Sequence, residues 1–226
     1  MDGAALRSER CGHPVICMIT AAIQAGGDDE RALVERVGAA ARAGVHLIQI
    51  RQPQMEGRAL NRLVERSVLA AKGTAARILV NDRADVALVV GAHGVHLRSG
   101  SMPAARVRAI APRGFVIGRS VHSADEGARV GQEGNLDYLV FGTVFRTRSK
   151  PGIAAVGIDA LAAACAGVAI PVLAVGGMTL SRLGTVARAG AAGCAAVGLF
   201  ADCPLEQMPS VVRQALSAFD TSRDLP

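Results

Sequence analysis

Eight short apolar runs, separated by stretches with helical periodicity, constrain the fold of this chain more than any other feature. Such runs are typical of parallel strands that helices cover on the outside. Eight strand–helix units without a break in composition predict an α/β protein with a single (β/α)8 TIM barrel rather than an open sheet. The predicted strands are Val15–Thr20, Leu47–Arg51, Arg77–Asn81, Gly94–Leu97, Val116–Ser120, Tyr138–Val144, Pro171–Val175 and Gly193–Leu199.

Helical patterns fill the intervals between these runs. Apolar stripes at helical spacing occur near Leu33 and Leu60, and the clearest one runs from Met208 to Phe219. We expect one domain over residues 1–226, with frayed ends at about 1–13 and 221–226. Helices after strands three to seven are predicted over Asp82–Val90, Pro103–Ile110, Ala124–Gly131, Asp159–Ala166 and Leu180–Ala189.

Composition excludes several classes of protein. Half of the residues are hydrophobic and 19% are charged, which argues against disorder. The net charge is +6, but the arginines are spread over the helices without an aromatic and basic platform, so we expect no nucleic-acid partner. No apolar run is long enough to span a membrane, and the first residues do not resemble a signal peptide. We therefore expect a cytoplasmic protein without a membrane partner.

The five cysteines are odd in number and show no CxxC spacing. We expect neither disulfides nor a cysteine metal site.

Polar residues gather at the ends of the predicted strands, where barrel enzymes carry their chemistry. Gln49 and Arg51 share one face at the end of strand two, because side chains alternate along a strand. We expect Arg51 to meet an anion of the ligand, and the alternative is an ion pair with Asp82. Asn81 ends strand three beside Asp82, which could bind a metal, bind a ligand or cap the next helix.

Glycines follow the last two strands. Gly176 and Gly177 come after strand seven, and Val197 and Gly198 end strand eight. Barrels often bind a phosphate at these two loops, and glycine lets backbone N–H groups approach the anion closely. The four residues therefore predict a phosphate site, and the alternative is a pair of tight turns without a ligand.

The loop after strand six carries three cations and two hydroxyls over residues 145–152. Thr143, Thr147 and Lys150 are candidate substrate-binding residues there. Lys150 is one of two lysines in a chain that otherwise uses arginine, which indicates a need for an ammonium group. The alternative is an exposed basic loop.

His122 follows strand five, close to Ser120, which is a further candidate for substrate binding. Histidine is the side chain best suited to move protons near pH 7, so His122 is the predicted catalytic residue. His96 ends strand four, where a structural histidine is the ordinary alternative.

Taken together, these residues resemble the thiamine phosphate synthase/TenI superfamily from about Val15 to Phe200. The resemblance implies a small phosphorylated thiazole substrate and a homo-oligomer, which is common in the superfamily. The matching segments are Gln49-Ile50-Arg51, Asn81-Asp82-Arg83, Gly94-Val95-His96-Leu97, Ser120-Val121-His122-Ser123, Phe141-Gly142-Thr143-Val144-Phe145 with Thr147 and Lys150, and Gly176-Gly177-Met178-Thr179.

The superfamily holds two activities. Thiamine phosphate synthase joins hydroxymethylpyrimidine diphosphate to thiazole phosphate and expels pyrophosphate with Mg²⁺. The TenI-type thiazole tautomerase aromatises thiazole carboxylate phosphate by a proton shift and needs no metal.

Two positions depart from the synthase pattern. Pro53 stands where the synthase motif Gln-x-Arg-x-Lys has its lysine, and Ser101 stands where the synthase has an aspartate that binds the metal. The first change removes a cation and the second a metal ligand, and both groups would stabilise the negative charge of the departing pyrophosphate. The segments Ser99-Gly100-Ser101 and 118–123 instead resemble the tautomerase, whose catalytic histidine falls on His122.

The sequence therefore predicts a thiazole tautomerase without a cofactor, in which His122 takes a proton from the ring and returns it at the exocyclic carbon. Arg51 or Lys150 would meet the substrate carboxylate. The alternatives are a Mg²⁺-dependent synthase with Asp82 as a metal ligand, or a non-catalytic regulatory protein that binds thiazole phosphate. The roles of Arg98 and Arg119 stay open at this stage.

Overall fold

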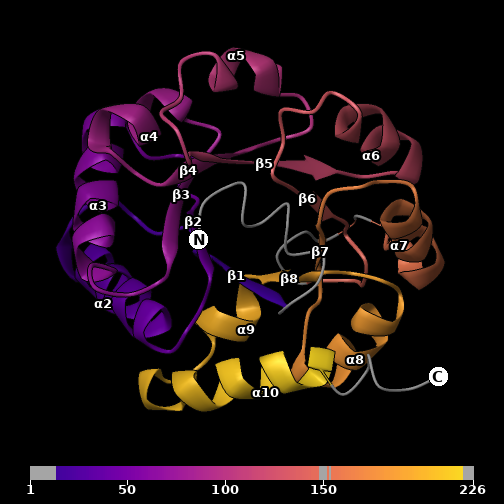
Figure 1. The fold of residues 1–226 in the computed structure, drawn as a ribbon. Helices are drawn as coiled ribbons and strands as arrows, with labels where there is room; N and C mark the ends of the chain where they lie inside the picture. Colours follow the sequence, from indigo (N-terminus) through magenta and orange to yellow (C-terminus); the bar gives the residue numbers. More distant parts are fainter. Residues whose placement is uncertain (1–13, 148–151, 153, 221–226) are drawn as a thin grey trace.

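The chain folds into a closed barrel of eight parallel strands with helices around the outside (Figure 1), which confirms the predicted (β/α)8 TIM barrel. The computed structural model describes residues 14–147, 152 and 154–220. Each strand pairs with the next in sequence, and β8 closes the barrel on β1. The strands are β1 Val15–Ile19, β2 Leu47–Ile50, β3 Arg77–Asn81, β4 Gly94–Leu97, β5 Val116–Val121, β6 Tyr138–Phe141, β7 Val172–Val175 and β8 Gly193–Ala196.

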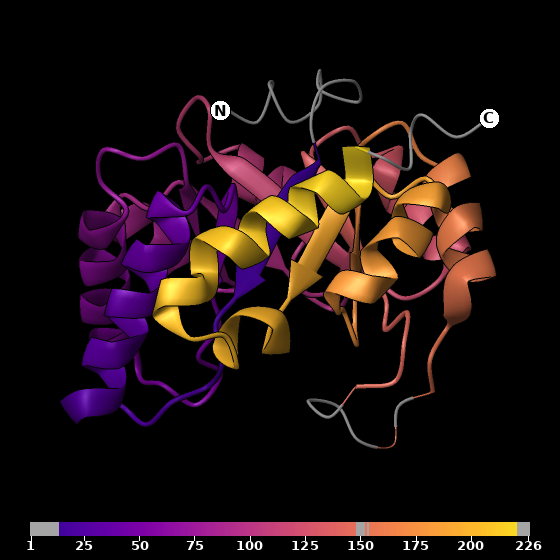
Figure 2. The same ribbon diagram turned by 90° about the horizontal axis from the view of Figure 1, so that it is seen from below.

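The helices form a ring around the strands. The strand arrows point to the lower side of Figure 2, so the loops at that side carry the carboxyl ends of the strands. The last helix, in yellow, lies across the outside of the barrel beside α8 (Figure 2). The helices are α2 Gly27–Arg42, α3 Gly57–Ala70, α4 Ala84–Val90, α5 Ala104–Arg108, α6 Ala124–Gly131, α7 Gly157–Ala166, α8 Leu180–Arg188, α9 Gly198–Ala201, the 3-10 helix η1 Leu205–Gln207 and α10 Met208–Asp220.

Alternation along the strands separates two apolar cores. Side chains that point inward, such as Cys17 and Leu79, fill the barrel, while their neighbours Met18 and Val80 pack outward against the helices. The inner core consists of Val15, Cys17, Ile19, Leu47, Leu79, Val116, Tyr138, Val140, Leu173 and Ala195. This packed interior leaves the carboxyl ends of the strands as the place for polar side chains.

Among the described apolar residues of the inner core, Tyr138 is the one with an aromatic ring. Its ring lies over Gly118 on the neighbouring strand, where a Cβ would overlap the ring atoms. Gly118 therefore provides the space that the tyrosine occupies.

Several boundaries differ from the sequence-based expectation by one to three residues, and three of these differences have a clear physical reason. β6 ends at Phe141 rather than Val144, because the N–H groups of Val144 and Phe145 turn to the carbonyls of Val175 and Gly176, at 2.8 and 3.2 Å. β8 ends at Ala196 rather than Leu199, since the short helix α9 begins at Gly198. The helix after β3 begins at Ala84 rather than Asp82, because Asp82 has a φ of 64°, outside the helical region.

In the part of the chain that the structure describes, no helix has both the length and the apolar character needed to cross a membrane. The described cysteines Cys17, Cys165, Cys194 and Cys203 are free thiols. The terminal segments 1–13 and 221–226, for which we expect fraying, lie outside the described residues.

Candidate active site

At the ends of β2 and β3, two amides form one unit inside the barrel. Gln49 is only 2% exposed, and its Nε2 donates to Asn81 Oδ1 at 2.8 Å. Gln49 Oε1 is buried and accepts no hydrogen bond from any described residue. Because an unpaired buried oxygen is costly, this atom marks a place where a bound ligand or water would donate a hydrogen bond.

Arg51 follows β2 and its side chain is partly exposed. Its backbone N–H donates to Thr20 Oγ1 at 2.9 Å, which fixes the start of the loop. Among the described residues Arg51 forms no salt bridge, and Asp82 pairs with Arg98 instead. The alternative of an Arg51–Asp82 ion pair is therefore wrong, and Arg51 stays a predicted anion-binding residue.

Asp82 connects the ends of β3 and β4. Its Oδ2 accepts a hydrogen bond from Arg98 Nε at 2.7 Å and lies 2.6 Å from Arg98 Nη2 in a salt bridge, and its Oδ1 accepts a hydrogen bond from Ser101 Oγ. Its backbone N–H donates to the carbonyl of His96 at 2.8 Å. The side chain does not cap α4, because Arg83 occupies the cap position and makes no side-chain cap. The capping alternative for Asp82 is therefore wrong.

Arg119 points outward from β5 and is only 6% exposed. Its guanidinium donates to the carbonyls of Ser99 and Ser101, at 3.4 Å each, and to that of Met102. Arg119 thus holds the loop after β4 in place. Three backbone carbonyls compensate in part for the burial of this cation.

His96 is a buried structural residue inside the barrel. It is 2% exposed, its Nε2 lies 2.8 Å from Ser120 Oγ, and its Nδ1 lies 2.9 Å from the Tyr138 hydroxyl. Burial, with the positive charge of Arg119 second, lowers the pKa of His96 to about 3. The ring is therefore neutral near pH 7 and orients Ser120 at the rim of the barrel.

Sequence reasoning missed the role of Tyr138 in this chain of hydrogen bonds. The available signal was that the only tyrosine of the protein stands in a strand made otherwise of aliphatic residues and one phenylalanine.

His122 lies exposed just after β5. Its Nδ1 is 2.6 Å from the carbonyl of Gly142, so Nδ1 carries the proton and Nε2 is left for a ligand. Its backbone N–H donates to Glu126 Oε2 at 2.7 Å, and the N–H of Glu126 donates to Ser123 Oγ at 3.1 Å. This pair of bonds caps α6 and fixes the backbone that carries the histidine.

The glycines after β7 adopt conformations that other residues rarely take. Gly176 and Gly177 have φ values of 102° and 63°. A Cβ at Gly177 would lie 2.6 Å from the carbonyl oxygen of Arg146. Within the described residues, the N–H groups of Gly177 and Gly198 have no acceptor. Both N–H groups are thus available to an anion.

Arg182 is a second residue that sequence reasoning missed. Its Nη1 donates to the carbonyl of Gly177 at 2.6 Å, and its guanidinium carbon lies 4.7 Å from the centre of the Phe145 ring. A cation therefore lies beside the predicted phosphate loop. No sequence signal marked it, because Arg182 is one of many arginines on helix surfaces.

The remaining candidates line the same loops. Thr143 is buried against Gly176, and its carbonyl accepts the N–H of Val156 at 2.8 Å. Thr147 is half-buried. Lys150 lies outside the described residues, so its predicted role stays a prediction.

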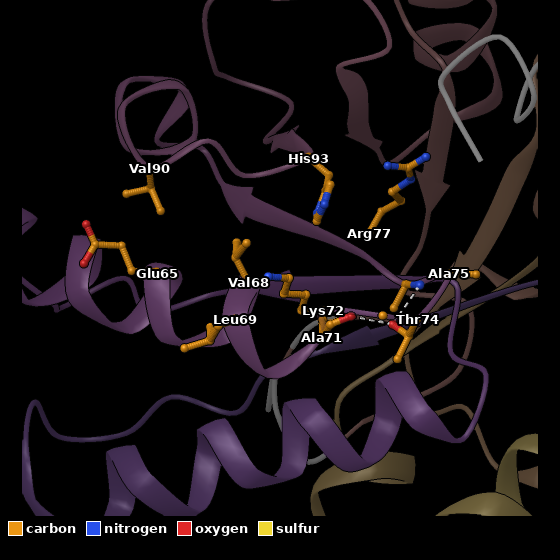
Figure 3. A pocket seen from close by; sticks show the side chains of 12 residues that line it. Glu65, Val68, Leu69, Ala71, Lys72, Thr74, Ala75, Arg77, Val90 and His93 are labelled. Atoms are coloured by element: carbon orange, nitrogen blue, oxygen red, sulfur yellow. Dashed lines mark hydrogen bonds between the residues drawn. The ribbon is translucent and has the colours of Figure 1, made fainter.

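A cavity of about 490 Å³ lies at the opposite end of the barrel, where β3 and β4 begin (Figure 3). Arg77, His93 and Lys72 line it together with Val68 and the end of α3. None of the predicted site residues lines this cavity, so it is distinct from the site. A second cavity, of about 550 Å³, lies beside Pro53 at the carboxyl ends of β1 and β2.

Comparison with known proteins identifies the family. Residues 16–200 match the TMP-TENI family, described as thiamine monophosphate synthase. A thiamine-phosphate synthase of Chlorobium luteolum is 34% identical over 93% of this chain and 95% of its own length. One of Roseiflexus castenholzii is 34% identical over 85% of this chain and 83% of its own. The solved thiamine phosphate pyrophosphorylase of Pyrococcus furiosus has a TM-score of 0.76 and 27% identity, and covers 92% of this chain and 96% of its own.

These relatives overturn the predicted tautomerase, because two are named thiamine-phosphate synthase and the third thiamine phosphate pyrophosphorylase. That prediction gave decisive weight to Pro53 and Ser101 as lost charge. That comparison left Arg98 unassigned, and in the structure this residue forms a salt bridge with Asp82, so the loop after β4 keeps a charged side chain next to Ser101.

The fold, the polar rim and the matched residues agree, and the chain is an enzyme that belongs to the thiamine monophosphate synthase family.

Proposed function

We propose that the enzyme is a thiamine-phosphate synthase, which joins hydroxymethylpyrimidine diphosphate to thiazole phosphate. The observation that carries the proposal is the near full-length similarity to proteins of that name. The geometry supports it, because the rim offers two separate places for anions. One is formed by arginine side chains after β2 and β4, and the other by backbone N–H groups after β7 and β8.

The reaction needs both phosphorylated substrates to be held so that the attacking nitrogen faces the carbon that carries the diphosphate. A ring nitrogen of the thiazole forms a bond to the pyrimidine methylene carbon, and the carbon–oxygen bond to the diphosphate breaks. The electron pair of that bond leaves with pyrophosphate, and no proton is removed from carbon. The protein therefore has to position two rings and stabilise negative charge that grows on the leaving group.

The residues can be assigned to these tasks as part of the proposal. The N–H groups of Gly177 and Gly198, with Gly176, Val197 and Arg182 around them, would hold the thiazole phosphate. Gln49 Oε1 would accept a hydrogen bond from the pyrimidine, because it is buried and lacks a partner among the described residues. Arg51 would bind the diphosphate.

Ser120, Asn81, Thr143 and Thr147 complete the wall of this proposed site. His96 and Tyr138 position Ser120.

We keep His122 as the proposed catalytic residue, with a role that fits the synthase reaction. Its Nε2 is the ring nitrogen turned away from the Gly142 carbonyl, so a protonated ring would donate to an oxygen of the departing pyrophosphate. Loss of this donor lowers turnover more than it weakens substrate binding, since the charge grows during the reaction.

The superfamily's synthase reaction uses Mg²⁺, and the residues around Asp82 do not fit such an ion. Both carboxylate oxygens of Asp82 are engaged, one of them by the cation of Arg98. Within residues 14–147, 152 and 154–220 there is no group of three or more His, Cys, Asp or Glu side chains that could hold a metal. No step of the proposal is routed through a metal.

The test is an assay of the purified protein with both substrates in buffer that contains Mg²⁺, with thiamine phosphate and pyrophosphate measured by mass spectrometry. Equal amounts of the two products are expected. His122→Asn should lower kcat about 10²-fold while KM changes little. The absence of thiamine phosphate with both substrates present would contradict the proposed function.

A further inference from the structure

Arg98 is held in an orientation that suits a second anion. Its Nε donates to Asp82 Oδ2 at 2.7 Å, and its Nη2 lies 2.6 Å from the same oxygen in a salt bridge. A guanidinium carries five N–H groups in one plane, so the hydrogen bond from Nε leaves donors on the two terminal nitrogens. Asp82 thus fixes the plane of the guanidinium, and the N–H groups that do not face Asp82 are left for another acceptor.

The remaining donors are accessible. The side chain of Arg98 is 69% exposed, while that of Asp82 is 23% exposed. An exposed ion pair of this kind contributes little to the free energy of folding. A role in folding stability therefore does not explain the fixed orientation of Arg98.

Hydrogen bonds with Ser101 and Arg119 fix the loop that carries Arg98. The N–H of Arg98 donates to Ser101 Oγ at 2.9 Å, and that hydroxyl donates to Asp82 Oδ1. The buried guanidinium of Arg119 binds three carbonyls of the same loop. Arg98 is therefore preorganised, and little conformational entropy is lost when an anion binds to it.

We propose that Arg98 takes the place of a divalent cation in this enzyme, so that the diphosphate group binds to the guanidinium without metal. This inference rests on the proposed synthase function, because it concerns the diphosphate of that reaction. The triad of Asp82, Arg98 and Ser101 occupies the place where the synthase pattern has a second carboxylate. The guanidinium meets the charge of the pyrophosphate directly, through N–H donors that the bond to Asp82 leaves available.

The test is isothermal titration calorimetry with pyrophosphate as the probe, on the purified protein in EDTA and again in Mg²⁺. We expect binding in EDTA, with an affinity that Mg²⁺ changes by less than about threefold. Arg98→Gln should weaken the binding in EDTA about tenfold or more, because charged hydrogen bonds are lost. Arg98→Lys keeps the charge without the planar fork, and we expect an intermediate loss.

Arg106→Gln is the matched control. Arg106 is an exposed arginine on α5, a few residues further on, and its replacement removes the same charge. We expect its affinity to stay within about twofold of the unmodified protein, as for most surface changes.

Three outcomes would overturn the inference. Pyrophosphate binding that requires Mg²⁺ would show a metal-dependent site, and equal affinity of Arg98→Gln would show that Arg98 forms a surface ion pair only. Equal losses in Arg98→Gln and Arg106→Gln would show an effect of net charge. The proposed function fails separately, when no thiamine phosphate forms in the two-substrate assay with Mg²⁺.

Discussion

The two halves of the barrel rim present polar groups from different parts of the chain. After β2 to β5, the polar groups are side chains that bind one another across strands, as in the pair Gln49–Asn81 and the triad of Asp82, Arg98 and Ser101. After β7 and β8, the available groups are backbone N–H groups at Gly177 and Gly198. The first half depends on residue identity, and the second depends on backbone conformation.

This difference teaches where substitutions are informative. A side-chain site can change one residue at a time, and under our proposal Arg98 provides a cation for the diphosphate in place of a metal. The backbone site after β7 has no such freedom, since its geometry depends on Gly176 and Gly177, which have positive φ. The departures Pro53 and Ser101 both lie in the half that is built from side chains.

The largest expected effect is at the backbone site. Gly177→Ala places a Cβ 2.6 Å from the Arg146 carbonyl oxygen in a left-handed conformation, so the loop must move. We expect kcat/KM for thiazole phosphate to fall about 100-fold, from strain and lost phosphate contacts. Steady-state kinetics measure the fall, and the melting temperature checks the fold. Gly198→Ala is the control, because its nearest neighbour is Asp202 Oδ2 at 3.5 Å, and an equal loss there would break the comparison.

A smaller effect, on stability, is expected inside the barrel, where Tyr138 and His96 lie beneath the side-chain half of the rim. Tyr138→Phe removes the hydroxyl bound to His96 Nδ1 and leaves that nitrogen buried without its partner. We expect the free energy of unfolding to fall by about 2 kcal/mol. Urea denaturation followed by circular dichroism measures it. Ser120→Ala removes the partner of the other ring nitrogen, and unchanged stability in both variants would show that the His96 bonds do not matter.

The buried His96 should also make the free energy of unfolding depend on pH below about 6.5. An unfolded histidine takes up a proton near pH 6.5, whereas burial holds the pKa of the folded His96 near 3. The unfolded chain therefore binds more protons within this window, and stability falls as the pH falls from 6.5 to 3. The slope from this one group is at most about 1.4 kcal/mol per pH unit. Denaturation at several pH values measures it, and His96→Asn should remove that part of the slope.

The smallest effect is expected at the cap that carries His122. Glu126→Gln weakens the bond to the His122 N–H, so we expect kcat to fall by about two- to threefold with stability reduced by less than about 1 kcal/mol. Kinetics with both substrates check this. Asp125→Asn changes the charge on an exposed neighbour in the same turn and should leave kcat unchanged. A fall of similar size there would point to charge rather than to the cap.

The fold could be predicted from the sequence because each strand is a separate apolar run with its own turn signals. β3 and β4 have the predicted bounds, since polar residues follow them directly. β6 and β8 were predicted too long, because apolar residues continue past the last residue that pairs with a neighbouring strand.

The site could be predicted only in part. Gln49 and Asn81 were each predicted at the end of a strand, and they lie there, but the hydrogen bond between them was not predicted. The partner of Asp82 could not be predicted, since Arg98 lies 16 residues away and reaches Asp82 only when β3 and β4 are adjacent. The unusual φ of Asp82 likewise depends on contacts that form after the barrel closes.

The tyrosine that lies over Gly118 has a consequence for the history of the family. A side chain at position 118 and the ring at position 138 cannot occupy the same space, so neither position can change freely while the other stays the same. Among relatives, the two positions should vary together, with a larger residue at 118 accompanied by a smaller one at 138. His96 would then lose the partner of its Nδ1, so a lineage that exchanges this pair must also find a new way to hold its buried histidine.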